Sequence, residues 1–555
     1  MATRKKTTYG GAFDSNPVTP QNQPIPGREV EMIKNASGGY GFKLEDQQQF
    51  IRFLVLGTEG GSYYEDERKL TAQNVESMIR LIKQAPDLVV PTILDVRKRN
   101  LALKQSPTIF ALALATTFKE TRQAALAAVN EICITASQLF EFYAVLKDIG
   151  GDNSNRSLRN ALANWYKARD AKSLGYQAIK YRNRNGISHA DMIRISHPSS
   201  PDQDVQAVLA WILRREMSGE NESASPEFME RFRRVDADAK RAVERNEQLF
   251  AFEELQLAKN AATAAKLIAK YKLPREAVPT QFLNDKEVWA ALAESMPYTA
   301  LVRNLNKMTA VGLIGAFGNG TWKDKLVDQN VIVKSRVHPL RILMASKQYA
   351  AGHGDRGSLT WTPNGNIISA LDDAFAIAMT HNIDPITENV AVAIDVSGSM
   401  HGARVSGLDN MLSVEAAAVL AVCYLRANPN TLVFGVDTRI HNLPINASTS
   451  INDAMAIALK YGGGGTNLGE AFNHVKKNLP EADGVLMVTD NESWYGNAHV
   501  SQEKHAAKKA LRWVNVETSA NQASVVDPRD RDSLSLCGFS ADVMTITNLF
   551  MSRQI

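Results

Sequence analysis

The sequence predicts a two-part fold, in which a long region of α-helical repeats precedes a smaller α/β domain of the doubly wound class. From residue 40 onward, about three hundred residues carry Leu, Ile and Ala at three- and four-residue spacing with almost no strand signal. Beyond residue 390, apolar runs of strand length alternate with helical stretches, which is typical of a parallel sheet covered on both faces. At 555 residues, the chain is also too long for one hydrophobic core.

Composition divides the chain into four segments. Residues 1–29 are rich in Thr, Gly, Pro, Asn and Gln and have little to bury, which predicts a mobile tail. Residues 30–360 form the helical region, and residues 361–388 form a linker that carries one helix. Residues 389–555 form the α/β domain.

The helical region is expected to contain helices of ordinary length joined by short connections. Without an interleaved sheet, such helices suggest stacked hairpins of the HEAT type, an α-solenoid. No strict period repeats in the sequence. The expected helices cover residues 46–56, 71–84, 106–117, 119–129, 136–148, 156–169, 188–196, 203–216, 235–270, 285–295, 298–308, 338–350 and, in the linker, 367–380.

The α/β domain is expected to alternate between strands and helices. Crossovers of the observed length join parallel strands and place helices on both faces of the sheet. The expected strands cover residues 390–396, 430–437, 484–490 and 511–516. The expected helices cover residues 407–427, 451–461, 469–478 and 501–510.

The bulk composition excludes several classes of protein. A net charge of +4 is not that of a polycation, so any nucleic-acid surface must be a local patch. Three cysteines, Cys133, Cys423 and Cys537, lie far apart and suit a reducing compartment with free thiols. The basic N-terminus is followed by no apolar signal segment, and the aliphatic runs are too short to span a bilayer. We therefore expect a cytoplasmic protein with no membrane partner.

One apolar run ends in a group of oxygen donors. Residues 390–394 read as a strand buried on both faces, and Asp395-Val396-Ser397-Gly398-Ser399 follows it. If the chain stays extended here, the side chains of Asp395, Ser397 and Ser399 point the same way. They then lie at the edge of the sheet where open α/β folds place ligands. Such hard oxygen donors suit Mg²⁺ or another divalent cation.

Two later segments supply further donors to this expected site. Four glycines at 462–465 lead to Thr466, and a second buried strand over 484–489 ends in Asp490. The pattern D-x-S-x-S, then Thr, then Asp resembles the metal-ion-dependent adhesion site of a von Willebrand factor A domain. The predicted metal ligands are therefore Asp395, Ser397, Ser399, Thr466 and Asp490. Bound there, the ion either docks an acidic protein ligand or is structural.

Several stretches along the chain also match the sequence motifs of one protein family. They are GTEGGSYY (57–64), WY (165–166), KYRNRNGISH (180–189), MPYTALVRNL (296–305) with KMT (307–309), GHGDRG (352–357) and CGF (537–539). Together with the metal motif they resemble the Ro 60 kDa autoantigen family, of TROVE plus von Willebrand factor A domains. The chain is similar to a bacterial or phage Ro orthologue of that family from about residue 30 to its end.

The resemblance implies a ring of helical repeats closed by the α/β domain. It implies binding of Y-like small non-coding RNAs on the outer surface. It further implies binding of single-stranded 3′ ends of misfolded or defective RNAs in the central hole, in RNA quality control and the stress response. An exoribonuclease tethered through RNA is a further candidate partner, and we expect a monomer.

A basic segment over residues 180–197 is the expected RNA contact. Its cations outnumber its acid, Asp191, and Ser188 is a good N-cap, so cations beside a helix start form a plausible phosphate site. An isolated charge run is more often a solvated helix face. The resemblance implies RNA contact most directly for Lys180, Arg184 and His197, and less directly for Arg182, His189 and Arg194. Weaker candidates are Arg303, His338 and Lys347.

Enzymatic functions find no support in the sequence. There is no G-x-x-x-x-G-K-[ST] or H-E-x-x-H motif, and the histidines form no ligand cluster. We therefore predict an RNA-binding ring protein that is not an enzyme. The alternative is a metal-dependent scaffold that grips an acidic partner without RNA, and a nuclease is disfavoured.

Overall fold

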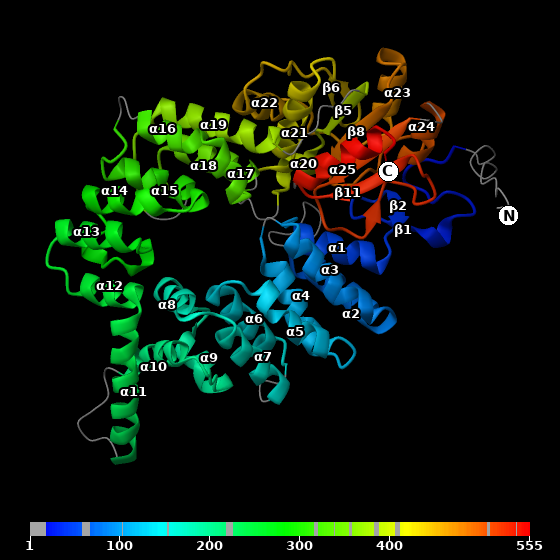
Figure 1. Cartoon of the computed structure of the whole chain (residues 1–555). Coiled ribbons are helices and arrows are strands. Elements are labelled where there is room, and N and C mark those ends of the chain that lie inside the picture. The colour runs from blue at the N-terminus through cyan, green and yellow to red at the C-terminus, as the bar shows by residue number, and fades with distance from the viewer. Residues whose placement is uncertain are drawn as a thin grey trace, which may run out of the picture. The chain divides into compact units, whose positions relative to one another are not determined.

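The computed structural model of the chain describes residues 18–57, 67–102, 104–151, 155–217, 226–315, 320–337, 339–354, 358–381, 388–405, 411–507, 511–539 and 541–554. The chain divides into two compact units. The helical unit contains Leu81–Arg99 and Gln105–Ala378. The α/β unit combines Met1–Arg80 and Asn100–Lys104 with Met379–Ile555. Figure 1 shows both units, with strands concentrated in the second.

The helical unit consists of short helices that pack mainly on their neighbours in sequence, such as α4 on α5 and α6, and α13 on α14. This local packing is typical of a solenoid, so the predicted helical-repeat architecture is confirmed. The helices are α3 (Pro86–Lys98), α4 (Ser106–Thr116), α5 (Arg122–Ile132), α6 (Ala136–Asp148), α7 (Arg156–Lys167), α8 (Ala171–Lys180), α9 (His189–Ser196), α10 (Gln203–Met217), α11 (Pro226–Arg245), α12 (Glu247–Gln256), α13 (Ala261–Tyr271), α14 (Lys286–Ser295), α15 (Tyr298–Ala310), α16 (Gly320–Val327), α17 (Gln329–Ser335), α18 (Pro339–Ala351) and α19 (Gly365–Thr380). Closure of these helices into a ring stays a prediction.

The prediction of one continuous helix over residues 235–270 is wrong, because two asparagines divide this stretch into separate helices. The side chain of Asn246 accepts hydrogen bonds from the first backbone N–H groups of α12, and Asn260 does the same for α13. Each asparagine is an N-cap, which starts a new helix in a new direction. Periodicity alone missed these breaks, since the apolar spacing continues across them.

A short β-hairpin, also not expected, joins α8 to α9. Its strands are β3 (Asn183–Arg184) and β4 (Ile187–Ser188). Asn185 and Gly186 between them both have positive φ, as a two-residue primed hairpin turn requires. The Ser188 hydroxyl then accepts a hydrogen bond from the Asp191 N–H, and the Asp191 carboxylate accepts one from the Ser188 N–H. The predicted N-cap at Ser188 is therefore confirmed.

His189, the first residue of α9, lies in the core of the helical unit rather than on its surface. Its side chain is 3% exposed, and its Nδ1 lies 3.0 Å from the hydroxyl of Tyr166. The ring also packs edge-on against Phe140. Burial lowers the pKa of His189 to about 4. The expectation that this imidazole contacts RNA is therefore corrected, because its edges are used inside the protein.

The α/β unit is built on a six-stranded sheet of order β11-β9-β8-β5-β6-β7, parallel except for the last pair. Parallel strands with helices between them confirm the predicted doubly wound class. The strands are β5 (Val390–Asp395), β6 (Leu432–Val436), β7 (Ile440–His441), β8 (Gly484–Thr489), β9 (Arg512–Glu517) and β11 (Ser533–Cys537). The helices are α20 (Gly398–Gly402), α21 (Ser413–Ala427), α22 (Ile451–Ala458), α23 (Glu470–Asn478), α24 (Val500–Ala507) and α25 (Ala541–Met551).

Both faces of this sheet are buried, which explains why its strands read as unbroken apolar runs. On one face, alternate residues of β5 and β8, such as Ala393 and Met487, pack against Phe472 of α23. The other face carries the residues between them and contacts α21 and α25.

Within the described residues, no helix is both long and apolar enough to cross a bilayer. Cys133 and Cys423 are buried free thiols, as expected.

The N-terminal segment folds with the α/β unit. It contains η1 (Glu29–Glu31), β1 (Met32–Lys34), β2 (Tyr40–Lys43), α1 (Asp46–Leu56) and α2 (Glu67–Gln84) as far as Arg80, and β2 pairs with β10 (Ala523–Ser524). Arg52 of α1 forms an ion pair with Glu517 at the end of β9, and both side chains are buried. The sequence predicts a mobile tail over residues 1–29, whereas residues 18–29 lie in contact with this domain. Residues 1–17 are outside the described part of the chain.

His189 makes the stability of the helical unit depend on pH. Its pKa is about 4 in the folded chain and near 6.5 when unfolded. Between these values the unfolded chain binds the extra proton, so stability falls as pH falls from about 6.5 toward 4. Relative to a non-titrating His189→Gln variant, the native protein should lose up to about 2 kcal/mol more between about pH 7.5 and 5. Urea unfolding followed by circular dichroism measures this difference, and parallel pH profiles would contradict it.

Candidate functional site

Two carboxylates lie at neighbouring strand ends in the α/β unit. β5 and β8 are adjacent and parallel, with Ile394 opposite Val488, so both strands end at the same edge of the sheet. Asp395 is the last residue of β5, and Asp490 directly follows β8. Their side chains are 0% and 3% exposed. The fold therefore places two acidic groups together at the edge where such sheets bind ligands.

Hydroxyl groups surround these carboxylates. One oxygen of Asp395 accepts a hydrogen bond from the Ser397 N–H at 2.9 Å, and the other accepts one from the Thr489 hydroxyl at 2.6 Å. The hydroxyls of Ser397 and Ser399 lie 3.1 Å apart, and Ser399 also hydrogen-bonds Asp490. The two serines and two aspartates of the predicted metal site thus form one connected group.

The glycine loop that precedes Thr466, the fifth predicted ligand, contacts the segment that carries the two serines. The Gly463 N–H donates to the Val396 carbonyl at 2.7 Å, and Gly398 donates to the Gly464 carbonyl at 3.0 Å. The Thr466 carbonyl accepts the Trp494 N–H, just beyond Asp490. Its hydroxyl is buried and has no hydrogen-bond partner among the described residues. A buried orphan hydroxyl is costly unless something absent from the protein chain satisfies it.

The electrostatics of the site favour a cation. Burial, and then the charge of Asp490, raise the pKa of Asp395 to about 7. Burial raises the pKa of Asp490 as well. Within the described residues, neither carboxylate forms an ion pair with Lys or Arg. Two uncompensated buried carboxylates and three hydroxyls, one of them unsatisfied, fit a divalent ion with hard oxygen ligands.

Some contributors to this site carried no clear sequence signal. Thr489, the Asp395 partner, precedes a predicted ligand by one position and could have been noticed there. Glu492 is 2% exposed, and burial followed by the charge of Asp490 raises its pKa to about 7. Asn35 and Ser37 contact the loop after Asp490 from more than 450 positions away. No local pattern could have linked them to the metal motif.

The predicted RNA cations occupy the connection from α8 to α9 in the helical unit. Lys180, the last residue of α8, donates to the Tyr176 hydroxyl at 3.1 Å. Although burial disfavours its charge, this hydrogen bond and the nearby tyrosines raise the pKa of Lys180. Arg182 is exposed, lies 5.2 Å from the ring centre of Phe252, and donates to the Glu276 carbonyl. Cations beside aromatic rings are typical of surfaces that bind single-stranded nucleic acid.

Further along, Arg184 is exposed on the hairpin, and no hydrogen bond or ion pair joins its guanidinium to another described residue. Arg194 is exposed on α9 and lies 3.8 Å from Asp191. His197 is exposed and adopts a left-handed backbone conformation at the C-cap of α9. Among the weaker candidates, Arg303 is exposed, Lys347 is half-buried, and His338 lies outside the described residues.

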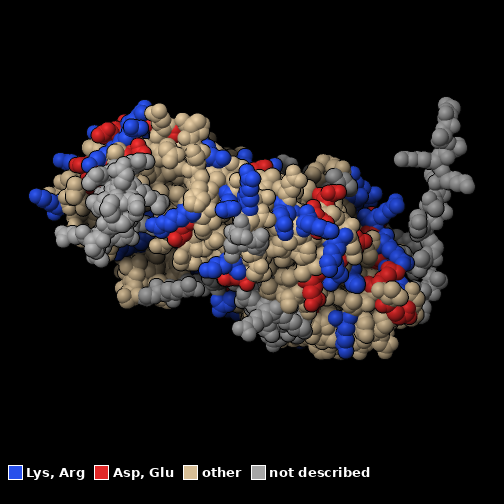
Figure 2. Space-filling model, turned by 90° about the horizontal axis from the view of Figure 1, so that it is seen from below, with Lys and Arg blue, Asp and Glu red and all other residues tan. Residues whose placement is uncertain are grey.

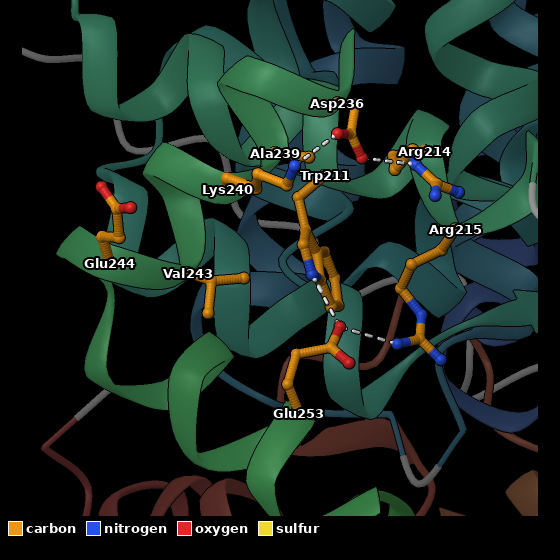
Figure 3. Close-up of a pocket in the computed structure, with 9 residues that line it drawn as sticks. All are labelled: Trp211, Arg214, Arg215, Asp236, Ala239, Lys240, Val243, Glu244 and Glu253. Carbon is orange, nitrogen blue, oxygen red and sulfur yellow. Dashed lines mark hydrogen bonds and ion pairs between the residues drawn. The ribbon is translucent and has the colours of Figure 1, made fainter. Parts of the chain in front are cut away.

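On the face drawn in Figure 2, Lys and Arg side chains lie in several groups with acidic side chains among them. A cavity of about 480 Å³ lies between α10, α11 and α12 (Figure 3). There, Asp236 pairs with Arg214 and Lys240, and Glu253 pairs with Arg215. Because acids already neutralise these cations, this cavity is a weak candidate for phosphate binding.

Comparisons with known proteins cover nearly the whole chain. A TROVE domain model matches residues 33–348, and a Ro60 vWA domain model matches residues 389–551. The chain is 31% identical to a Deinococcus radiodurans protein named RNA-binding protein RO60, over 97% of this chain and 99% of that one. It is 29% identical to RNA-binding protein RO60 of Caenorhabditis elegans, over 95% of this chain and 92% of that one. A crystal structure of the Deinococcus radiodurans RO (RSR) protein matches with a TM-score of 0.67 and 30% identity, over 92% of this chain and 100% of that one.

Proposed function

Since the chain belongs to the Ro60 family of TROVE-domain proteins, as the resemblance predicted, we propose that it is an RNA-binding protein of non-coding RNA quality control. It binds Y-like small RNAs and the single-stranded 3′ ends of misfolded or defective RNAs. The observation that carries this proposal is full-length similarity to two proteins named RNA-binding protein RO60. It includes both the TROVE and the Ro60 vWA regions.

The α8–α9 connection supports contact with the RNA backbone. Lys180, Arg182 and Arg184 follow one another at alternate positions, and the first two lie against aromatic rings. Aromatic contacts hold long cationic side chains in place at low entropic cost, while their charged ends stay available to phosphates. Arg184, which has no partner within the described residues, is the cation best placed to accept one.

The metal site has a separate role in this proposal. Asp395, Ser397, Ser399, Thr466 and Asp490 hold Mg²⁺ or another divalent cation. When bound, such an ion attracts an anionic group of a partner molecule. The carboxylates neutralise the ion, and the serine and threonine hydroxyls complete its shell from the protein side.

We propose no catalytic activity for the chain. We further propose that it acts as a cytoplasmic monomer, with an exoribonuclease joined to it through RNA. A second candidate function, the metal-dependent scaffold without RNA, is favoured by one observation, the buried and unsatisfied hydroxyl of Thr466. RNA that copurifies from nuclease-free preparations separates the two functions.

Asp395→Ala should abolish divalent-ion binding, because it removes a charged ligand at the centre of the site. The loss should exceed the roughly 10–100-fold typical of outer-shell changes. The helical unit should keep its circular dichroism, since its core is separate. Titration calorimetry with Mn²⁺ on the full chain measures the effect. The control is Asp453→Ala, which removes an acid near the start of α22. Equal affinity in both variants would refute the metal site.

Replacing both Lys180 and Arg184 by alanine should weaken RNA binding and its dependence on salt. Each phosphate contact to a single strand contributes about −0.7 to the log–log salt slope, so the slope should fall by about one unit or slightly more. Backbone contacts carry no base information, so the effect should vary little with RNA sequence. A single-stranded 3′ tail should bind better than a blunt duplex.

The control for this experiment is Lys240→Ala with Arg241→Ala. These exposed cations of the helical unit pair with acids of their own helix, α11, so the variant removes the same charge elsewhere. It should leave the salt slope of the native protein almost unchanged. If the Lys180 and Arg184 variant keeps the native slope, these two side chains are ordinary solvated charges.

A further inference from the structure

We infer that the N-terminal segment, residues 19–43, positions the metal-site loop, which we define as residues 490–496. This inference rests on the metal-binding part of the proposed function and assigns positioning roles to Asn35 and Ser37. Neither residue belongs to the metal motif, and both lie more than 450 positions from the loop in sequence. The segment and the loop are parts of the same compact unit.

The turn between β1 and β2 makes the closest contacts with the loop. The Asn35 amide donates to the Ser493 carbonyl at 2.8 Å. The Ser37 N–H donates to the Glu492 carboxylate at 2.9 Å, and the Ser37 hydroxyl donates to the Glu492 carbonyl at 3.0 Å. Three hydrogen bonds thus join this turn to two consecutive residues of the loop.

The turn packs tightly against the loop at Gly39. A Cβ atom on Gly39 would lie 2.1 Å from the Ser493 carbonyl oxygen and 2.7 Å from the Trp494 Cα. The backbone of the turn therefore lies directly against the backbone of the loop, and a side chain at residue 39 would force them apart. Such close approach fixes where the loop can lie, beyond what hydrogen bonds alone would do.

The loop contains one of the predicted ligands, Asp490, and contacts a second, Thr466. The Glu492 N–H donates to the Asp490 carboxylate at 3.2 Å, so the residue held by Ser37 also orients a ligand. Asn521 donates to the Asp490 carbonyl and to the Glu492 side chain. The Ser493 hydroxyl and the Trp494 N–H donate to the Thr466 carbonyl. Displacement of the turn would therefore disturb both Asp490 and Thr466.

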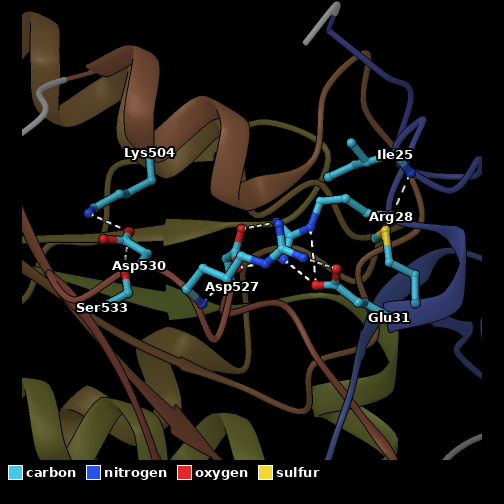
Figure 4. A network of polar contacts seen from close by, with 9 residues as sticks. Ile25, Arg28, Glu31, Lys504, Asp527, Asp530 and Ser533 are labelled. Carbon is cyan, nitrogen blue, oxygen red and sulfur yellow. Dashed lines mark hydrogen bonds and ion pairs between the residues drawn. The ribbon is translucent and has the colours of Figure 1, made fainter. Parts of the chain in front are cut away.

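The rest of the segment is fixed to the same region, so the turn is well supported. The Gln21 N–H donates to the Gly496 carbonyl, and the Gln21 side chain accepts from the Val500 N–H. His499 Nε2 lies 2.7 Å from the Gln23 carbonyl. Arg28 forms buried contacts with Asp527 and pairs with Glu31, as Figure 4 shows. The N-terminal segment is therefore an integral part of the folded α/β unit.

Two linked equilibria follow from this geometry. A docked turn holds the loop in the arrangement that places Asp490 and Thr466, so the metal ion does not have to order it. By reciprocity, a bound ion must stabilise the docked turn by the same factor. Coupling of this kind distinguishes positioning from ordinary structural support, which would change stability without depending on the ion.

The test compares two Asn-Ala-Ser turns in the full chain. Asn35→Ala with Ser37→Ala should weaken Mn²⁺ binding roughly fivefold or more in titration calorimetry. The control is Asn446→Ala with Ser448→Ala, because the same three residue types form an exposed turn of the same unit there. The control variant should bind Mn²⁺ with native affinity. Equal affinity in the two double variants would overturn the inference.

A second measurement needs no change in the turn. Saturating Mn²⁺ should slow hydrogen exchange at the Ser37 amide in the native chain and should not do so in Asp395→Ala. Unchanged exchange in a native chain that binds Mn²⁺ would overturn the inference but leave the metal site standing. If the native chain binds no Mn²⁺, or Asp395→Ala binds it equally well, the metal proposal and this inference both fail.

Discussion

The burial of two carboxylates at neighbouring strand ends is the constraint on which the α/β unit depends. Asp395 and Asp490 lie close enough for the charge of one to raise the pKa of the other. The surrounding hydroxyls replace only some of the hydrogen bonds to water that the two carboxylates lose on burial. Among the described residues, no cation neutralises the carboxylates. Without an ion such a site costs stability, which points to use of the charge. The N-terminal segment lies against the loop that this arrangement must hold in place.

In the helical unit, some charged side chains are neutralised by neighbours of opposite charge. Its cavity between α10 and α12 is lined by cations and acids that neutralise each other, which stabilises packing but leaves little field for a ligand. In the α8–α9 connection Lys180 and Arg182 lie beside aromatic rings, and within the described residues neither forms an ion pair with an acid. The difference between acidic and aromatic neighbours separates a structural cluster from a candidate RNA contact.

The fold class could be predicted because apolar periodicity differs between a solenoid and a parallel sheet. The grouping of Asp395, Ser397 and Ser399 could be predicted because they lie in one short motif directly after a buried strand. His189 could not, since a histidine in a basic segment reads the same whether its ring is exposed or buried. The break at Asn246 was hidden because apolar spacing continued through it. Asn35 and Ser37 act on the site only through tertiary contacts, which no local pattern records.

RNA binding through the α8–α9 connection is the property that most needs a direct test. Ultraviolet cross-linking in cells, followed by mass spectrometry of the cross-linked peptides of the full chain, tests it most directly. We expect small structured RNAs cross-linked within residues 176–197, where Tyr176 and Tyr181 lie beside the Lys180 amine. A chain that carries no RNA, or one whose cross-links fall only in the α/β unit, would contradict it.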